Sequence, residues 1–275
     1  MHETAEQVGA EPLPEGLGRA IRETAEDIAA LLRSASGTAL PVPGSEWTVG
    51  EVAAHLALAN ELMADLAAGR ERPYGDGTPQ SLAAANARSL TTFAERRAEP
   101  LAAVITGQAE AFLDAVTRTG SDGPVPATPL GPMRRPVLAS YLLTHMLGHG
   151  YDLARALRRP HMIDAARVGL CMPFMLSVMP RVADTEATAG LTVRYRIRLR
   201  GGGVFGVSVA DGAVRVDPGV PAHRTDCTIL IEPTAFLLIA LGRRDPWRAI
   251  AQGQVLAWGR KPWLAPRFPA LFTAP

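Results

Sequence analysis

Residues 47–56 have the sequence WTVGEVAAHL, which contains a strong signal for the start of a helix. Thr48 precedes Glu51 by three residues, the spacing of a capping box, in which each side chain bonds the backbone N–H of the other residue. Apolar residues follow at once and recur at helical spacing. The pattern predicts a helix from about Val49 to Ala68, on which His55 points toward apolar neighbours.

Four further helical stretches are predicted within residues 1–189, where Ala, Leu, Glu and Arg predominate. They are expected at about 16–32, 80–119, 134–157 and 164–179. The stretch 80–119 contains Pro100, which removes a helix hydrogen bond, so a kink or two separate helices are expected there. Long helices with short to moderate connections predict a four-helix bundle with one appended helix.

The chain changes character near Gly190. A half-buried strand is predicted at 191–199, because apolar side chains alternate with arginines from Val193 to Leu199. Further strands are expected at 204–209, 213–216, 225–231 and 254–258, with helices at 232–241 and about 262–272. This order predicts an α+β fold, in which helices cover one face of a small antiparallel sheet. We expect residues 1–185 to form the helical domain and residues 186–275 the sheet domain.

Composition narrows the classes of partner. The 275 residues include 28 basic and 27 acidic side chains, and this near-neutral balance disfavours a nucleic-acid partner. No apolar stretch reaches about 18 residues and no charged leader precedes one, so no membrane contact is expected. Two cysteines without a C-x-x-C pair indicate a reducing, cytoplasmic location. The composition favours a cytoplasmic protein that acts on small molecules. We expect a monomer or homodimer, although composition does not determine the oligomeric state.

Three histidines form the candidate metal site. His145 and His149 are four residues apart, so both project from one face of the predicted helix. His55 also faces the bundle core or its edge. Three neutral imidazoles with one open position form a known catalytic zinc arrangement, and other first-row divalent metals also accept imidazole. Core histidines without a metal are the alternative, and spacing alone does not separate the two interpretations.

The stretch at 47–56 also resembles the second-helix signature of the mycothiol-dependent maleylpyruvate isomerase family, part of the DinB-like superfamily of metal-binding four-helix bundles. HMLGHGYDL at 145–153 resembles the other metal motif of the family. FLLIALGR at 236–243 is similar to the apolar helix, ending in Gly-Arg, of its sterol-carrier-type domain. The resemblance covers nearly the whole chain and implies a DinB-like bundle followed by a sterol-carrier-like α+β domain.

The resemblance implies a divalent metal, most often zinc, held by His55, His145 and His149. Its open position would take the thiol of mycothiol or of another low-molecular-weight thiol. One departure is visible, because the isomerase itself typically has glutamate at the position of His145. Histidine there keeps metal binding and makes the ligand set neutral, which should lower the pKa of a metal-bound thiol further. It leaves open whether the reaction is the isomerisation of the family.

The predicted function is that of a metal-dependent S-transferase or isomerase, which activates mycothiol as a thiolate for attack on an electrophilic small molecule in a biosynthetic or detoxification pathway. Two further site residues are predicted. Arg243 is positioned to hold an anionic substrate, with a helix-terminal role as the alternative. Asp152 is positioned to orient an imidazole or to bind polar groups of the thiol, with surface pairing to Arg155 or Arg159 as the alternative. Trp47 is expected to pack as a hydrophobic staple beside the capping box rather than to contact a ligand.

Three other functions remain open from the sequence. The same site would serve a hydrolase that uses metal-bound water. The bundle would also serve as a non-catalytic scaffold or regulator with structural histidines. Alternatively, the C-terminal domain would carry an apolar ligand. A measurement of metal content distinguishes the scaffold, which needs no metal, from the metal-dependent enzymes. A test for thiol dependence then distinguishes the transferase, which needs the thiol, from the hydrolase.

Overall fold

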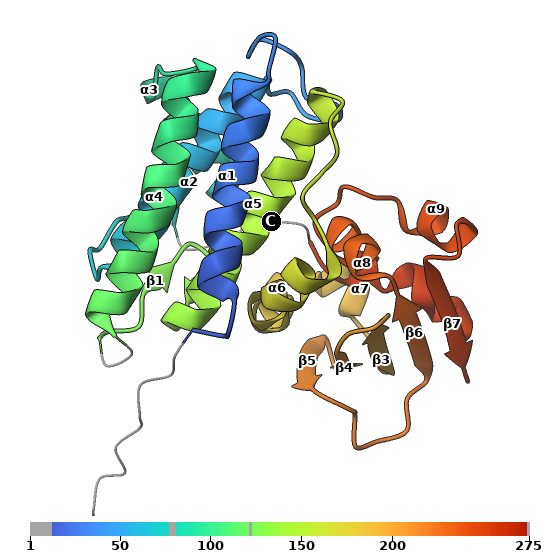
Figure 1. The fold of residues 1–275 in the computed structure, drawn as a ribbon. Coiled ribbons are helices and arrows are strands. Elements are labelled where there is room, and N and C mark those ends of the chain that lie inside the picture. Colours follow the sequence, from blue (N-terminus) through green and yellow to red (C-terminus); the bar gives the residue numbers. More distant parts are fainter. Residues whose placement is uncertain (1–12, 77–80, 121–122, 274–275) are drawn as a thin grey trace, which may run out of the picture.

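The computed structural model describes residues 13–76, 81–120 and 123–273, and it shows a helical bundle beside a smaller sheet domain (Figure 1). The helices predicted within residues 1–189 are confirmed. The helices of the first domain are α1 (Leu17–Arg33), α2 (Val49–Ala67), α3 (Leu82–Thr92), α4 (Ala98–Thr119), α5 (Arg135–Ala156) and α6 (Ala165–Val178). None of the helices in the described ranges is both long and apolar enough to cross a membrane.

Four helices enclose the core of the bundle. α1 and α2 each pack against both α4 and α5, which closes a ring of four neighbours (Figure 1). α1 contributes a stripe at helical spacing, on which Leu17, Ile21 and Ile28 are fully buried. Burying each such side chain contributes about 1.5–3 kcal/mol, so the stripe holds the helix in the bundle.

The capping box fixes the start of α2. The Thr48 hydroxyl accepts a hydrogen bond from the backbone N–H of Glu51 at 3.3 Å. The Glu51 carboxylate accepts one from the backbone N–H of Thr48 at 2.7 Å. These bonds fix the register of α2, which carries His55 two turns further on, with its side chain buried.

Two helices, α3 and α4, form within the predicted stretch 80–119, of which residue 80 lies outside the described residues. Two separate helices were one of the two predicted alternatives. The break lies at residues 93–97, where Phe93 and Arg97 have extended backbone conformations, and not at Pro100. Pro100 is the third residue of α4, where a missing N–H costs no helix hydrogen bond. The proline therefore fits the first turn of α4 without kinking it.

Short elements connect the bundle to the sheet domain. The hairpin of β1 (Ala127–Thr128) and β2 (Gly131–Pro132) precedes α5, and the turn η2 (Met179–Val182) and helix α7 (Thr185–Thr188) follow α6. The sequence patterns did not indicate these elements, because each is too short to show a period. α7 spans the expected domain boundary between residues 185 and 186, and that boundary stays a prediction.

The sheet confirms the α+β class with one difference from the predicted antiparallel pairing. Its strand order is β5-β4-β3-β6-β7, and β3 and β6 run parallel. Strands β3, β4 and β5 pair antiparallel through two hairpins. The chain then crosses to the other edge of β3, where β6 pairs with β3 in the same direction. The strands are β3 (Val193–Leu199), β4 (Val204–Ala210), β5 (Ala213–Pro218), β6 (Cys227–Ile231) and β7 (Val255–Gly259).

The helix that follows β6 packs against α6 of the bundle, and the next helix lies beside β7, farther from the bundle (Figure 1). They are α8 (Pro233–Ala240) and α9 (Pro246–Ala251). The helix expected near 262–272 consists of two short 3₁₀ helices, η3 (Pro262–Arg267) and η4 (Pro269–Leu271), and not of one continuous helix. Pro266 and Pro269 provide no N–H for α-helical hydrogen bonds.

The end of α8 meets α5 closely. A Cβ atom at Gly148 would lie 3.1 Å from Leu241 Cδ1, tighter than most packed contacts. Glycine at this position of α5 therefore permits residues 241–243 to approach the helix. This contact brings the second domain to the turn of α5 that carries His145 and His149.

Candidate metal centre

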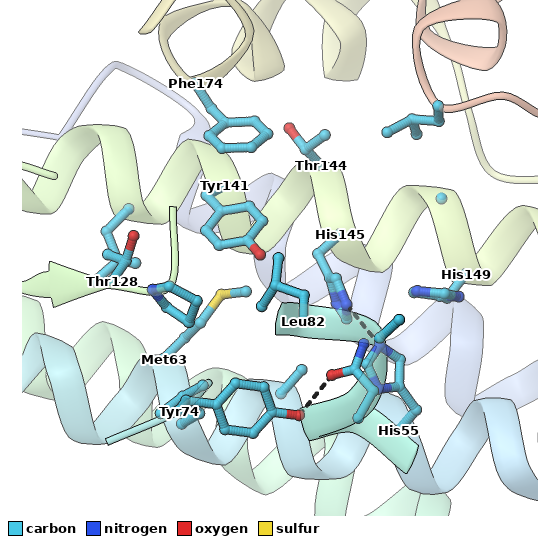
Figure 2. A pocket seen from close by; sticks show the side chains of 18 of the residues that line it. His55, Met63, Tyr74, Leu82, Thr128, Tyr141, Thr144, His145, His149 and Phe174 are labelled. Carbon is cyan, nitrogen blue, oxygen red and sulfur yellow. Dashed lines mark hydrogen bonds between the residues drawn. The ribbon is translucent and has the colours of Figure 1, made fainter. Parts of the chain in front are cut away.

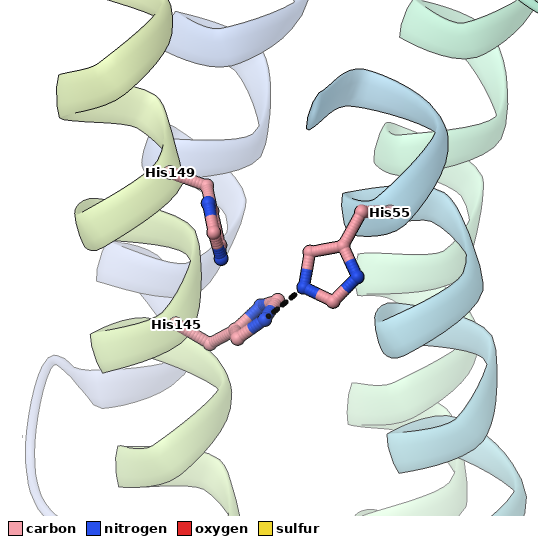
Figure 3. A group of neighbouring side chains, drawn as sticks. All are labelled: His55, His145 and His149. Carbon is pink, nitrogen blue, oxygen red and sulfur yellow. Dashed lines mark hydrogen bonds between the residues drawn. The ribbon is translucent and has the colours of Figure 1, made fainter. Parts of the chain in front are cut away.

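The three predicted histidines lie together between α2 and α5 (Figure 3). His145 and His149 project from successive turns of α5, and His55 projects toward them from α2. The Nε2 atoms of His55 and His145 are 3.0 Å apart. One ligand atom from each ring lies within 4.8 Å of the others. The packing of α2 on α5 thus brings together the residues that the sequence singled out.

The environment keeps the three imidazoles neutral. Burial lowers the pKa of His55 to about 4, and the positive charge of Arg243 adds to this effect. Burial also lowers the pKa of His145 and of His149 well below the usual value, and the neighbouring histidines lower both further. Neutral imidazoles carry a free nitrogen lone pair, the form that binds metal ions.

The donor set fits a divalent metal of intermediate hardness. Zinc bonds histidine nitrogen at about 2.0–2.1 Å, so tetrahedral ligands stand roughly 3.3 Å apart. The 3.0 Å separation of His55 and His145 and the 4.8 Å limit for the set are close to this spacing. The Nδ1 atoms of His145 and His149 are buried without a hydrogen-bond partner among the described residues. Three nitrogen donors favour zinc or a similar metal over magnesium or calcium, which prefer oxygen.

Asp152 and Arg243 form a two-pronged ion pair beside the cluster. Arg243 Nε lies 3.0 Å from Asp152 Oδ1, and Arg243 Nη2 lies 2.6 Å from Asp152 Oδ2. Asp152 Oδ2 is also 3.3 Å from His149 Nδ1, although that contact lacks hydrogen-bond geometry. Asp152 therefore pairs across the domain junction rather than with the surface arginines of its own helix.

A cavity of about 690 Å³ opens beside the histidines (Figure 2). The three imidazoles and Trp47 line one end. Apolar side chains line much of the remainder, among them Met63, Leu82, Leu138 and Phe174. The volume is typical of sites for small organic molecules. The histidine cluster therefore lies at one end of a chamber that has room for a substrate.

Two aromatic residues at this cavity were not predicted as site residues. The ring of Trp47 lies 5.0 Å from that of His55 and 6.4 Å from that of His149, so the tryptophan contacts the cluster as well as neighbouring the capping box. Tyr141 lies one helical turn before His145 and lines the same cavity. The four-residue spacing of His145 and His149, extended back by one turn, indicates Tyr141 as well.

Both cysteines are buried, as the sequence predicted. Cys171 and Cys227 are fully buried. Burial raises the pKa of the Cys171 thiol to about 12 and that of Cys227 to about 11. Neither thiol lines the cavity. A thiolate in this chamber would therefore come from a cosubstrate and not from the chain.

Two family profiles match the chain. The profile described as "Mycothiol maleylpyruvate isomerase N-terminal domain" matches residues 18–154. The profile described as "SCP-2 sterol transfer family" matches residues 179–259. The two matches include the histidine cluster and the strands β3 to β7.

Two solved structures share the fold of this chain over most of its length. The crystal structure of a mycothiol-dependent maleylpyruvate isomerase is 15% identical, with a TM-score of 0.53, over 89% of this chain and 93% of that chain. A histidine-to-alanine mutant of that enzyme is 13% identical with the same coverage and TM-score. A "UbiJ-SCP2 Ubiquinone synthesis protein" is 21% identical over 32% of this chain and 75% of that chain, with a TM-score of 0.27. A comparison with curated proteins finds no significant match.

Proposed function

The chain belongs to the mycothiol maleylpyruvate isomerase family, and from this membership we propose that it is a divalent-metal-dependent enzyme of thiol chemistry. It activates a small thiol, for which we propose mycothiol, for attack on an electrophilic small molecule. The product is a thiol conjugate, or a rearranged substrate when the thiol adds and then leaves. We place this activity in the cytoplasm, where small thiols are kept reduced.

The convergence of three neutral imidazoles on one cavity carries this proposal. His55, His145 and His149 would hold the metal, with zinc favoured by the nitrogen donors. A metal held there would lower the pKa of a thiol at its open position and so supply a thiolate at neutral pH. The neutral ligands leave the charge of the cation uncompensated, which strengthens this effect.

The remaining residues position the partners of the reaction. The apolar walls exclude water from the reacting atoms, which favours attack by a thiolate over attack by water. We propose Asp152 and Arg243 as positioning residues, because their ion pair fixes the second domain against the turn of α5 that carries His149. Trp47 packs on the ring of His55 and restricts its rotation.

Metal content tests the proposed ligands. The purified protein is expected to hold about one divalent metal ion per chain, measured by elemental analysis. His149→Ala should lose this metal because it removes one of three donors. His161→Ala is the matched control, because His161 lies in the loop after α5 against Tyr151, with ring centroids 5.5 Å apart. Wild-type protein that contains no metal, and whose stability does not change when metal is added, would overturn the proposal.

Thiol dependence tests the reaction class. Metal-loaded protein is incubated with an electrophile in the presence and absence of mycothiol, and substrate loss is followed. The transferase or isomerase proposal expects loss only when mycothiol is present. Equal turnover without thiol would establish the hydrolase instead, because water would then be the nucleophile.

A further inference from the structure

The polar side chains that line the cavity are largely occupied by partners within the protein. Three hydroxyl groups donate to nearby oxygens at 2.5–2.7 Å. The pairs are Tyr74 with the side chain of Asn86, Thr128 with the carbonyl of Gly131, and Thr144 with the carbonyl of Ser140. A ligand would have to break these bonds to use the donors, at the cost of leaving the partner oxygens unsatisfied.

The positively charged side chain at the cavity, Arg243, is also bound to partners within the protein. Arg243 is the one lysine or arginine that lines it within the described parts of the chain. Its Nε and Nη2 atoms bind Asp152, and its Nη1 atom donates to the carbonyl of Leu241 at 2.9 Å. Glu46 adds a negative charge to the lining. A dicarboxylate would thus meet no free side-chain cation here, and burying an unpaired carboxylate is costly.

The wall away from the histidines is apolar and aromatic (Figure 2). Tyr141 and Phe174 stack with ring centroids 4.4 Å apart and an interplanar angle of 16°. Met63 and Leu82 lie on the other side of the same space. Such a slot favours a flat apolar or aromatic group, which gains area burial and ring contacts together.

The Tyr141 hydroxyl is the exception among these polar groups. It points into the cavity in Figure 2, and no hydrogen-bond partner for it occurs in residues 13–76, 81–120 or 123–273. Tyr141 precedes His145 by one turn of α5, so its side chain stands about 6 Å along the helix axis from the histidine. The hydroxyl therefore lies between the aromatic wall and the histidine cluster, where it can donate to an oxygen of a bound molecule.

We propose that the electrophile is an uncharged, largely apolar molecule of aromatic size, which presents an oxygen acceptor to Tyr141. This inference rests on the proposed function, and it distinguishes this chain from an enzyme that acts on a dicarboxylate such as maleylpyruvate. The apolar part of the molecule lies against Phe174, and its reactive carbon lies toward the histidines. A conjugated aromatic ketone has this combination of ring, acceptor oxygen and electrophilic carbon.

Direct binding tests the inference without relying on turnover. Benzylideneacetone, an uncharged aromatic enone, and maleate, a dicarboxylate, are titrated into the full-length protein by calorimetry, with and without metal. The enone is expected to bind at least tenfold more tightly than maleate in the metal-free form, where only the side chains of the cavity act on the two molecules. Maleate binding as tight as the enone in the metal-free protein would overturn the inference, because the metal then provides no charge for it.

A pair of variants tests the role of Tyr141. Tyr141→Phe keeps the aromatic wall and removes only the hydroxyl, so it should weaken enone binding roughly threefold to tenfold, the range for one hydrogen bond. Tyr151→Phe, on the same helix but packed against His161, should leave enone binding unchanged. Equal enone affinity in both variants would remove Tyr141 from the proposal.

The two proposals fail in different ways. If mycothiol with metal-loaded protein consumes maleate and leaves the enone unchanged, the thiol enzyme stands and the apolar substrate class is overturned. If the enone binds tightly but no thiol reaction occurs with either probe, the ligand class stands and the thiol enzyme is overturned.

Discussion

A single hydroxyl group sets the shape of one wall of the cavity. Pro173 lies inside α6, where it provides no N–H and its ring crowds the preceding turn. Ser140 of α5 enters the opened helix, donating to the carbonyl of Leu170 at 2.8 Å and accepting from the N–H of Phe174 at 3.1 Å. The serine thereby satisfies both groups and fixes Phe174, which lines the cavity.

Ser140→Ala should destabilise the protein by about 1–3 kcal/mol, because it removes the partner of a buried N–H and of a partly buried carbonyl. Urea unfolding of the purified variant measures the change. Ser89→Ala is the matched control, since among the described residues the Ser89 hydroxyl bonds only the carbonyl of Ala85 in its own helix. Equal stability of the two variants would show that the backbone groups of Leu170 and Phe174 do not depend on the serine for hydrogen bonds.

At the scale of the element, the start of α2 depends on a charged cap. Hydrogen bonds from the backbone and side chain of Thr48 hold the pKa of Glu51 below its usual value of 4.5. A carboxyl with a lowered folded-state pKa stabilises the fold above its unfolded pKa, and this contribution is lost as pH falls through the folded-state pKa. The cap therefore stabilises α2 at neutral pH and weakens in acid.

Glu51→Ala should reduce the free energy of unfolding by about 0.5–1 kcal/mol at pH 7, and the difference from wild type should shrink toward pH 3. Urea unfolding at both pH values provides the comparison. Glu26→Ala, at an exposed position of α1 with no described hydrogen-bond or ion-pair partner, controls for the loss of a helical glutamate. If Glu51→Ala lowers the free energy of unfolding by the same amount at pH 3 as at pH 7, the charge of the Glu51 carboxylate does not contribute to the cap.

At the scale of the whole molecule, the ion pair of Asp152 and Arg243 joins the two domains. Asp152 belongs to α5 of the bundle, and Arg243 follows α8 of the sheet domain, 91 residues later. Their side chains are only 15% and 20% exposed. The pair is thus shielded from water, and together with the close approach at Gly148 it fixes the second domain beside the histidine cluster.

Asp152→Asn should destabilise the full chain by about 1–3 kcal/mol, because it removes charge-assisted hydrogen bonds and leaves Arg243 poorly compensated. Chemical denaturation measures this loss. Asp114→Asn, an exposed position on α4, should change stability by less than about 0.5 kcal/mol. If Asp152→Asn has the same free energy of unfolding as the wild type, apolar contacts alone hold the domains together.

Local patterns determined the elements of this protein from sequence. The Thr48–Glu51 cap and the apolar period located α2, and the alternation around Tyr195 located β3 with its buried face. The spacing of His145 and His149 placed both on one face of α5. Such features depend on residues within one or two turns of each other, so consecutive residues encode them. The resemblance of the same segments to a known family then indicated the order of the two domains.

Only the tertiary structure decided which of these elements meet. His55 and His145 are 90 residues apart in the chain, and the packing of α2 on α5 brings their nitrogens to 3.0 Å. The same applies to the pairing of Asp152 with Arg243 and to the parallel alignment of β3 and β6. Periodicity shows which face of an element is apolar but not which partner covers it, because many packings bury the same area. The sequence by itself therefore determined the helices, the strands and the three histidines, whereas tertiary packing made the chamber that contains them.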